Sequence, residues 1–138
     1  MQIRQLGLDE LDTAYDLLKE LRGGLSYEAF EELVYDMRHQ EYRIYGVFEG
    51  EQLITYAGVG VLTNLYWKRH LFIYDLVTRA SHRERGYGKE MLLYLGDLAR
   101  MLRCERIALT SGHQRTEAHR FYETHGFASV SDAFVKTV

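Results

Sequence analysis

The segment from residue 71 to residue 102 constrains the fold most, because its apolar pattern changes from that of a strand to that of a helix across a short loop. Leu71–Thr78 is rich in β-branched and aromatic residues, which is typical of a strand. Gly86 and Gly88 close the loop, and an apolar stripe at spacings of three and four follows them. The stripe consists of Met91, Leu92, Leu95, Leu98, Ala99 and Leu102. A strand that leads through a glycine loop into a helix predicts an α/β chain.

The remaining elements extend this pattern over the whole chain. We expect helices over Leu8–Leu21, Ser26–Gln40, Met91–Leu102 and Thr116–His125. We expect strands over Ile3–Leu6, Tyr42–Phe48, Leu53–Val61, Leu71–Thr78, Arg106–Thr110, Phe127–Val130 and Ala133–Thr137. The order β-α-α-β-β-β-α-β-α-β-β predicts an α/β fold with a mixed sheet, since hairpin strands come first and helical crossovers later. There is no linker composition and no repeat, so we expect a single domain over residues 1–138.

Composition excludes several classes of protein. Of the 138 residues, 46% are apolar and 13% aromatic, which is enough for a sizeable core and too much for a disordered chain. The single cysteine, Cys104, cannot form a disulfide framework or a zinc knuckle, so we expect a cytoplasmic, reducing location and no metal. The amino terminus has no signal-peptide pattern, and no stretch approaches the roughly 20 apolar residues of a membrane span.

The distribution of charge narrows the choice of ligand. The net charge is −3, but the first 50 residues hold 5 Lys and Arg against 11 Asp and Glu, whereas residues 79–106 hold 7 against 4. A nucleic-acid binder needs a longer basic stripe than this, so we expect no nucleic-acid partner. A compact basic region suits one small anion better.

The loop before the long helix has the features of such an anion site. The first N–H groups of a helix are unpaired, glycine lets a ligand approach the backbone, and the helix dipole favours negative charge. Arg83, Arg85 and Lys89 add three cations around Gly86 and Gly88. The spacing fits neither the dinucleotide Gly-x-Gly-x-x-Gly motif nor the nucleotide-hydrolase phosphate loop. The alternative is that the two glycines only permit a tight turn.

Two motifs resemble those of one known family, the GNAT superfamily of N-acetyltransferases. Arg83-x-x-Gly86-x-Gly88 is similar to its Arg/Gln-x-x-Gly-x-Gly/Ala signature. The stretch from Ala118 to Phe127 is similar to its Ala-x-x-Phe-Tyr-x-x-x-Gly-Phe motif. The two occur in the family's order, about 35 residues apart, which is more specific than either motif alone.

The resemblance implies a GNAT-like fold and acetyl-CoA as co-substrate. The pyrophosphate would meet the backbone of Arg85, Gly86, Tyr87, Gly88 and Lys89, with Arg83 beside it. The pantetheine arm would run along Leu76, Val77 and Thr78, and the N–H of Val77 would polarise the acetyl carbonyl.

Acetyl transfer to an amine needs a proton for the departing thiolate and a route for the amine proton. The resemblance implies Tyr122 as the general acid; the alternative is a core tyrosine with a satisfied hydroxyl. Asp75 is the candidate base, because strand alternation places it on one face with Ile73 and Val77; a structural hydrogen bond is equally open. We expect Cys104, in the last turn of the long helix, to be inert. Roles for three histidines stay open, namely His82, His113 and His119.

The acidic front of the chain favours a cationic acceptor. Four acids, Glu28, Glu31, Glu32 and Asp36, follow one expected helix, and such a surface attracts an amine unless it is an ordinary solvated face. The sequence therefore predicts an acetyl-CoA-dependent N-acetyltransferase that acts on a small-molecule or lysine-type primary amine. The alternative is a non-catalytic module that binds or senses acyl-CoA. A homodimer through the carboxy-terminal strands is compatible with the sequence, which does not require one.

Overall fold

The computed structural model describes residues 1–138, and its contacts divide the chain into two units, Met1–Ala108 and Leu109–Val138. The strands are β1 (Gln2–Leu6), β2 (Arg43–Glu49), β3 (Gln52–Asn64), β4 (Lys68–Thr78) and β5 (Arg106–Leu109). The α-helices are α1 (Leu11–Leu18), α2 (Tyr27–Met37), α3 (Tyr87–Met101) and α4 (Thr116–Thr124). Short 3-10 turns, η1 (Leu8–Glu10), η2 (Arg38–Gln40) and η3 (Ala80–His82), adjoin these helices or the loops.

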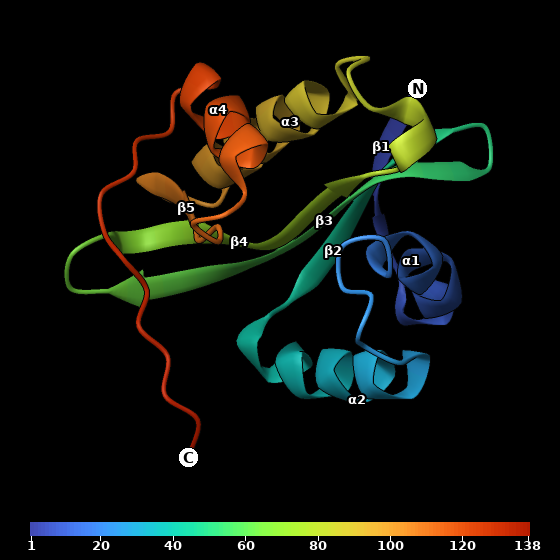
Figure 1. Cartoon of the computed structure of the whole chain (residues 1–138), viewed down its shortest axis with the longest axis horizontal. Coiled ribbons are helices and arrows are strands. Elements are labelled where there is room, and N and C mark those ends of the chain that lie inside the picture. Colours follow the sequence, from blue (N-terminus) through green and yellow to red (C-terminus); the bar gives the residue numbers. More distant parts are fainter. The chain divides into compact units, whose positions relative to one another are not determined.

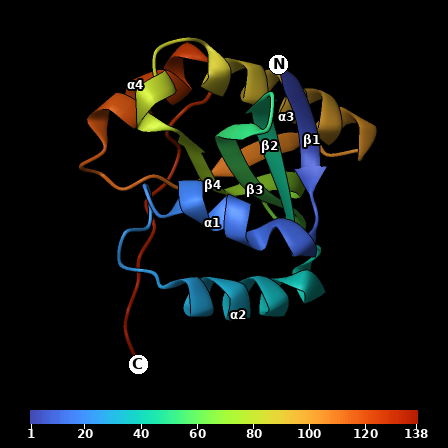
Figure 2. The same ribbon diagram turned by 90° about the vertical axis from the view of Figure 1, so that its right-hand side faces the viewer.

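The five strands form one sheet in the order β1-β2-β3-β4-β5. The first four pair antiparallel through successive neighbours, and β5 joins β4 after the α3 crossover, which makes the sheet mixed. Helices α1 and α2 lie on one face of the sheet, and α3 lies on the other (Figures 1 and 2). The predicted α/β fold with a mixed sheet is confirmed up to α4. None of the helices combines the length and apolar character of a membrane span.

Local sequence explains the helices on the α1 and α2 face. The apolar stripe of α1 is buried against β3 and β4, where it covers Tyr56 and Val77. Ser26 caps α2, because its Oγ accepts the Ala29 N–H at 3.1 Å. The predicted first helix is shorter than expected, since its start is the 3-10 turn η1 and its end is Leu18 rather than Leu21.

A β-bulge interrupts the register between β3 and β4. Gly58 pairs with Asp75 and Val59 with Ile73, so Tyr74 is the extra residue. Beyond the bulge the alternation is reversed: Asp75 shares a face with Val77, whereas Ile73 points to the opposite face, towards α3. The expectation that Asp75, Ile73 and Val77 share one face is therefore wrong for Ile73.

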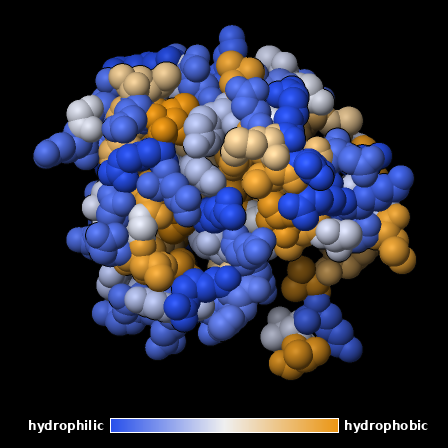
Figure 3. Space-filling view, turned by 180° about the vertical axis from the view of Figure 1, so that it is seen from behind, coloured by the Kyte–Doolittle hydropathy of each residue, from blue (hydrophilic) through white to orange (hydrophobic).

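The two closing strands expected over Phe127–Val130 and Ala133–Thr137 are not formed. Their alternation suits a strand, but a strand needs a paired neighbour, and an isolated two-stranded hairpin is at best marginally stable. Apart from the partly buried Phe127, the apolar side chains of these two stretches are exposed, Phe134 to 94% and Val135 to 92%, and Figure 3 shows apolar residues at the surface of the carboxy-terminal segment. A homodimer through these residues stays a prediction.

Cys104 lies outside α3 rather than in its last turn. The helix ends at Met101 because Arg103 adopts the left-handed conformation with φ 61°. The N–H of Cys104 then returns to the Ala99 carbonyl at 2.8 Å, and that of Arg103 to the Arg100 carbonyl at 3.1 Å. This is the Schellman arrangement, with arginine where glycine is usual.

Candidate functional site

The loop between β4 and α3 presents a row of unused backbone donors. Two left-handed residues, Glu84 at φ 63° and Gly86 at φ 88°, turn the chain sharply before α3. The first helical hydrogen bond runs from the Glu90 N–H to the Gly86 carbonyl at 3.0 Å. The N–H groups of residues 85–89 therefore have no acceptor in the chain. Successive free N–H groups at a helix start form a cradle for an anion.

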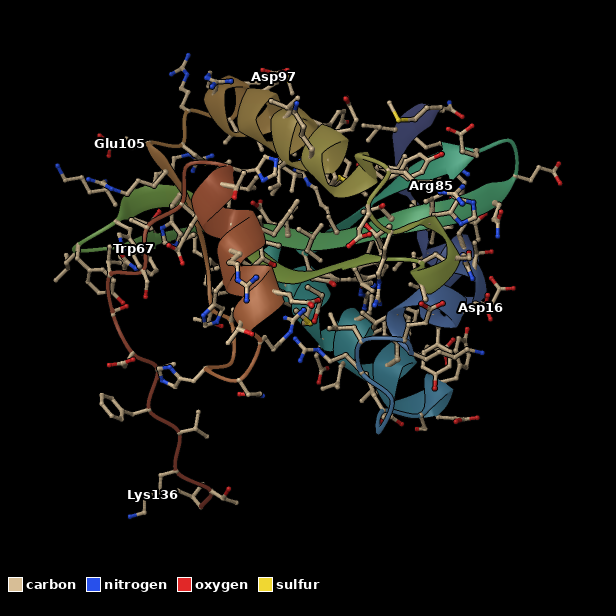
Figure 4. The ribbon with its side chains drawn as sticks, turned by 45° about the horizontal axis from the view of Figure 1, so that its top comes forward. Asp16, Trp67, Arg85, Asp97, Glu105 and Lys136 are labelled. Atoms are coloured by element: carbon tan, nitrogen blue, oxygen red, sulfur yellow. The ribbon has the colours of Figure 1, made fainter.

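Cations surround this cradle without being neutralised. Arg85 and Lys89 form no ion pair, and both side chains belong to exposed residues. Figure 4 labels Arg85 on the loop that enters α3. Arg83 is used partly within the loop, where its Nε donates to the Thr78 carbonyl at 3.2 Å. Free donors and free cations together suit a pyrophosphate, so the residues present fit the anionic part of a nucleotide ligand.

The hydrogen-bond ladder of β4 decides which backbone groups face outward. The N–H of Arg79 donates to the Ile54 carbonyl at 2.7 Å, in register with the pair Tyr56–Val77. Hydrogen-bonded pairs alternate along an antiparallel ladder, so the Val77 N–H is directed to β3. The N–H groups of Leu76 and Thr78 point away from β3. The Val77 N–H, expected to be free for a ligand, is therefore directed into the sheet.

The outer edge of β4 is open at that level. Strand β5 has four residues, and the chain enters it beside Arg69, whose carbonyl accepts the Glu105 N–H at 2.9 Å. At about 3.3 Å per residue, β5 ends before it reaches Leu76. The N–H groups of Leu76 and Thr78 are therefore directed to an open edge of the sheet.

Arg79 lies near the basic loop, but its side chain is used in contacts within the protein. Its Nε donates to the Leu53 carbonyl at 3.0 Å, and its guanidinium lies 3.6 Å from Asp16 and 3.8 Å from Glu20. Glu20 also accepts the Ala80 N–H at 2.9 Å, and Figure 4 labels Asp16 on α1. Arg79 therefore ties α1 to the end of β4.

Asp75 lies at the bulge with a partner that sequence reasoning missed. Arg22, from the connection between α1 and α2, donates a hydrogen bond from Nε to Asp75 Oδ1 at 2.8 Å, and its Nη2 lies 2.7 Å from the same oxygen as an ion pair. The Asp75 side chain is 16% exposed. Arg22 is one of few cations in an acidic region, directly before Gly23, and this isolation was the available signal.

Two tyrosines, the buried Tyr56 and the partly buried Tyr42, lie on the same face of the sheet as Asp75. The hydroxyls of Tyr42 and Tyr56 are hydrogen-bonded at 2.7 Å. Burial raises the pKa of both phenols, so both stay protonated in the physiological range. The Tyr42 hydroxyl occupies the place that a Cβ of residue 58 would take, which explains glycine there. A glycine inside a strand indicates that another group approaches the backbone closely, so Gly58 could have indicated this contact from the sequence.

Tyr122 lies on α4, in the smaller unit. Its ring contacts those of Phe121 and Phe127, with centroids 5.6 and 5.7 Å away. Its hydroxyl has no hydrogen-bond partner in the chain, and burial raises its pKa despite the opposing charge of Arg115. A phenol with a raised pKa keeps its proton at neutral pH and can donate it.

The cysteine and the three histidines have simple surroundings. Cys104 is half-buried, and burial raises the pKa of its thiol, which disfavours a nucleophilic thiolate. His82 contacts the Ser81 hydroxyl at 2.7 Å. His119 contacts the Gly112 carbonyl at 2.8 Å, and the exposed His113 lies 3.3 Å from Asp132. None of these four side chains lies in an arrangement that indicates a catalytic role.

The larger unit, Met1–Ala108, contains Asp75, the end of β4 and the glycine loop.

A family model described as the acetyltransferase (GNAT) family matches residues 11–127. The chain belongs to the GNAT family of acetyltransferases. It is an acetyl-CoA-dependent acyltransferase of the N-acetyltransferase class. Two Bacillus subtilis proteins are similar to this GNAT chain, the uncharacterized N-acetyltransferases YhdJ and YsnE. YhdJ is 34% identical over 94% of this chain and 93% of its own length, and YsnE is 32% identical over 66% and 59%.

Solved structures share the GNAT fold at low identity. A putative acetyltransferase from Agrobacterium tumefaciens is 23% identical, with a TM-score of 0.83 over 100% of both chains. The aminoglycoside N-acetyltransferase AAC(6')-Iy, solved in complex with CoA, is 15% identical, with a TM-score of 0.87 over 99% of this chain and 93% of its own. The ribosomal-protein-alanine N-acetyltransferase from Brucella melitensis is 16% identical, with a TM-score of 0.84 over 100% of both. These likenesses establish the fold.

Proposed function

We propose that this GNAT protein transfers the acetyl group of acetyl-CoA directly to a primary amine, with both substrates bound at once. The observation that carries the proposal is the set of free N–H groups at residues 85–89, flanked by the unpaired cations of Arg85 and Lys89. A row of free N–H donors of this kind is matched by the oxygens of a pyrophosphate. Arg83 adds a third charge beside it.

The open edge of β4 would hold the pantetheine arm. The N–H groups of Leu76 and Thr78 face away from β3 and would donate to the amide carbonyls of an extended arm. Val77 would not donate to the arm, because its N–H is directed to β3. Its side chain is buried in the core and would hold this part of β4 in place. When bound, acetyl-CoA supplies an acetyl group activated as a thioester.

Tyr122 and Asp75 would handle the protons. The amine nitrogen forms a bond to the acetyl carbon as the bond from carbon to sulfur breaks, and Tyr122 donates its hydroxyl proton to the departing sulfur. Asp75, through its carboxylate, accepts the proton that the amine loses. Solvent then returns the proton to the tyrosine. No covalent enzyme intermediate is needed, in keeping with the protonated state that burial favours for the Cys104 thiol.

Acidic side chains support a cationic acceptor. Glu28, Glu32 and Asp36 are exposed along α2, on the same side of the sheet as Asp75. A field of this sign raises the local concentration of ammonium groups, which favours a polyamine, an aminoglycoside-like amine or a lysine side chain over an acidic acceptor. The single thiol of the chain suits action in the reducing cytoplasm.

The Tyr122→Phe variant separates this enzyme from a module that only binds or senses acyl-CoA. We expect acetyl-CoA binding, measured by calorimetry, to be unchanged and kcat to fall by about 100-fold or more, as for loss of a general acid. Tyr94→Phe is the matched control, because the Tyr94 hydroxyl also has no hydrogen-bond partner and only its ring packs, on Tyr45. Equal activity of the two variants would remove Tyr122 from the mechanism.

A further inference from the structure

The two oxygens of the Asp75 carboxylate are in different states. Both contacts of Arg22 go to Oδ1: Nε donates a hydrogen bond at 2.8 Å, and Nη2 lies 2.7 Å away. No group of the chain donates to Oδ2, and this oxygen is not sealed from solvent. The pair joins residues 53 positions apart, one in the connection between α1 and α2 and the other at the bulge of β4. One oxygen is thus held, and the other is free to accept a hydrogen bond.

The ion pair between Arg22 and Asp75 contributes little to the stability of the fold. The Arg22 side chain is 51% exposed, and exposed ion pairs contribute little to folding. The carboxylate itself is only 16% exposed, beside the hydroxyl pair of Tyr42 and Tyr56. A ligand can reach a carboxylate in this position from few directions. The contacts of Arg22 with Oδ1 fix the rotation of the Asp75 carboxylate.

One glycine and two tyrosines surround the Asp75 carboxylate. Gly58 lies opposite Asp75 in the register, and the Tyr42 hydroxyl fills the space above it. Tyr74, the bulge residue, lies against the Tyr42 ring with the centroids 5.4 Å apart. Phenol rings and one free carboxylate oxygen are the groups that accept an ammonium or a primary amine.

We propose that Arg22 is a positioning residue for acetyl transfer: it holds Oδ1 of Asp75 so that Oδ2 accepts the hydrogen bond of the acceptor amine. The proposal rests on the proposed function and assigns the amine end of the acceptor to this carboxylate. Arg22 acts through Asp75 and does not touch the reacting atoms. Without it the carboxylate can rotate, and the amine loses its fixed approach to the acetyl carbon.

The test is a double-mutant cycle on the full chain with Arg22→Ala, Asp75→Asn and both together, measured with the best amine of a panel. We expect Arg22→Ala to lower kcat/KM for the amine by about 10- to 100-fold, with KM for acetyl-CoA unchanged. The double variant should be no worse than Asp75→Asn, because both changes remove one function. Arg22→Lys keeps the charge and one donor group, so it should recover much of the loss.

Arg38→Ala is the matched control, since the Arg38 guanidinium lies over the Tyr35 ring and does not reach Asp75. It should keep the activity of the wild type. Additive losses in the cycle, or an Arg22→Ala variant that only melts earlier at full kcat/KM, would overturn the positioning role. If the wild type releases no CoA with any amine, the proposed function fails and the role of Arg22 falls with it. Turnover with an additive cycle refutes Arg22 alone.

Discussion

Replacing Gly86 by alanine tests the anion cradle with the smallest possible change. Gly86 has φ 88°, and a Cβ built on it meets nothing within 4 Å. The substitution therefore adds backbone strain without a clash, at a cost of about 1–2 kcal/mol. The loop can relieve this strain by turning Gly86 towards a negative φ, which redirects the N–H groups that follow it.

The expected loss of binding follows from those donors. One hydrogen bond to a charged group contributes about 1.5–3 kcal/mol, so losing a single N–H contact weakens acetyl-CoA binding by at least about tenfold. At a ligand concentration of 100 times the wild-type Kd, wild-type stabilisation is about 2.7 kcal/mol, and a tenfold weaker variant retains about 1.4 kcal/mol. Thermal unfolding with and without acetyl-CoA measures both values.

Gly50→Ala is the control that isolates the cradle from strain. Gly50, in the turn between β2 and β3, has φ 59° and also meets nothing within 4 Å. Both variants should melt about 3–8 °C below the wild type without ligand. Only Gly86→Ala should lose part of the stabilisation by acetyl-CoA. Equal ligand-induced shifts in the two variants would refute the assignment of residues 85–89 to the pyrophosphate.

Three further predictions concern the tyrosines and the strand glycine. Because burial raises the pKa of Tyr122, kcat at saturating amine should stay level up to about pH 10 and fall only above it; a fall centred below pH 8 would assign the acid elsewhere. Burial also raises the pKa of Tyr42 and Tyr56 in the folded state, so their share of stability is complete below about pH 10 and is lost as the pH rises through the folded pKa. Urea unfolding between pH 8 and 11 measures this loss, and a flat dependence would contradict the buried hydroxyl pair. Gly58→Ala should cost about 1–3 kcal/mol by displacing the Tyr42 hydroxyl, whereas Gly96→Ala, in the open interior of α3, should stabilise by about 0.5–1 kcal/mol. Similar urea midpoints for the two glycine variants would show that Tyr42 moves aside freely.

Elements set by local pattern could be predicted from the sequence. The apolar stripe of α3, the Ser26 cap and the β2–β3 hairpin lie where their residues indicated, because each depends on neighbours within a few positions. The glycine loop was identified for the same reason, since a strand, glycines and a helix follow one another directly. The structure adds which N–H groups are free.

Features that depend on distant partners could not be predicted. The alternation of side chains along a strand does not indicate where an extra residue is inserted. The bulge at Tyr74 therefore places Ile73 on the face opposite to the one predicted. The pairing of Arg22 with Asp75 joins segments 53 residues apart and leaves no local pattern. The alternation over residues 127–137 predicts strands, but in the structure no strand pairs with this segment.

The most direct test is thiol release from acetyl-CoA across a broad panel of primary amines, with wild type and Tyr122→Phe compared at equal cofactor occupancy. We expect wild-type CoA release that depends on a cationic amine, with intersecting initial-rate lines that indicate both substrates bound at once, and near-complete loss in the variant. Tight acetyl-CoA binding with no amine-dependent release from the wild type would contradict direct acetyl transfer and favour a binding or sensing module.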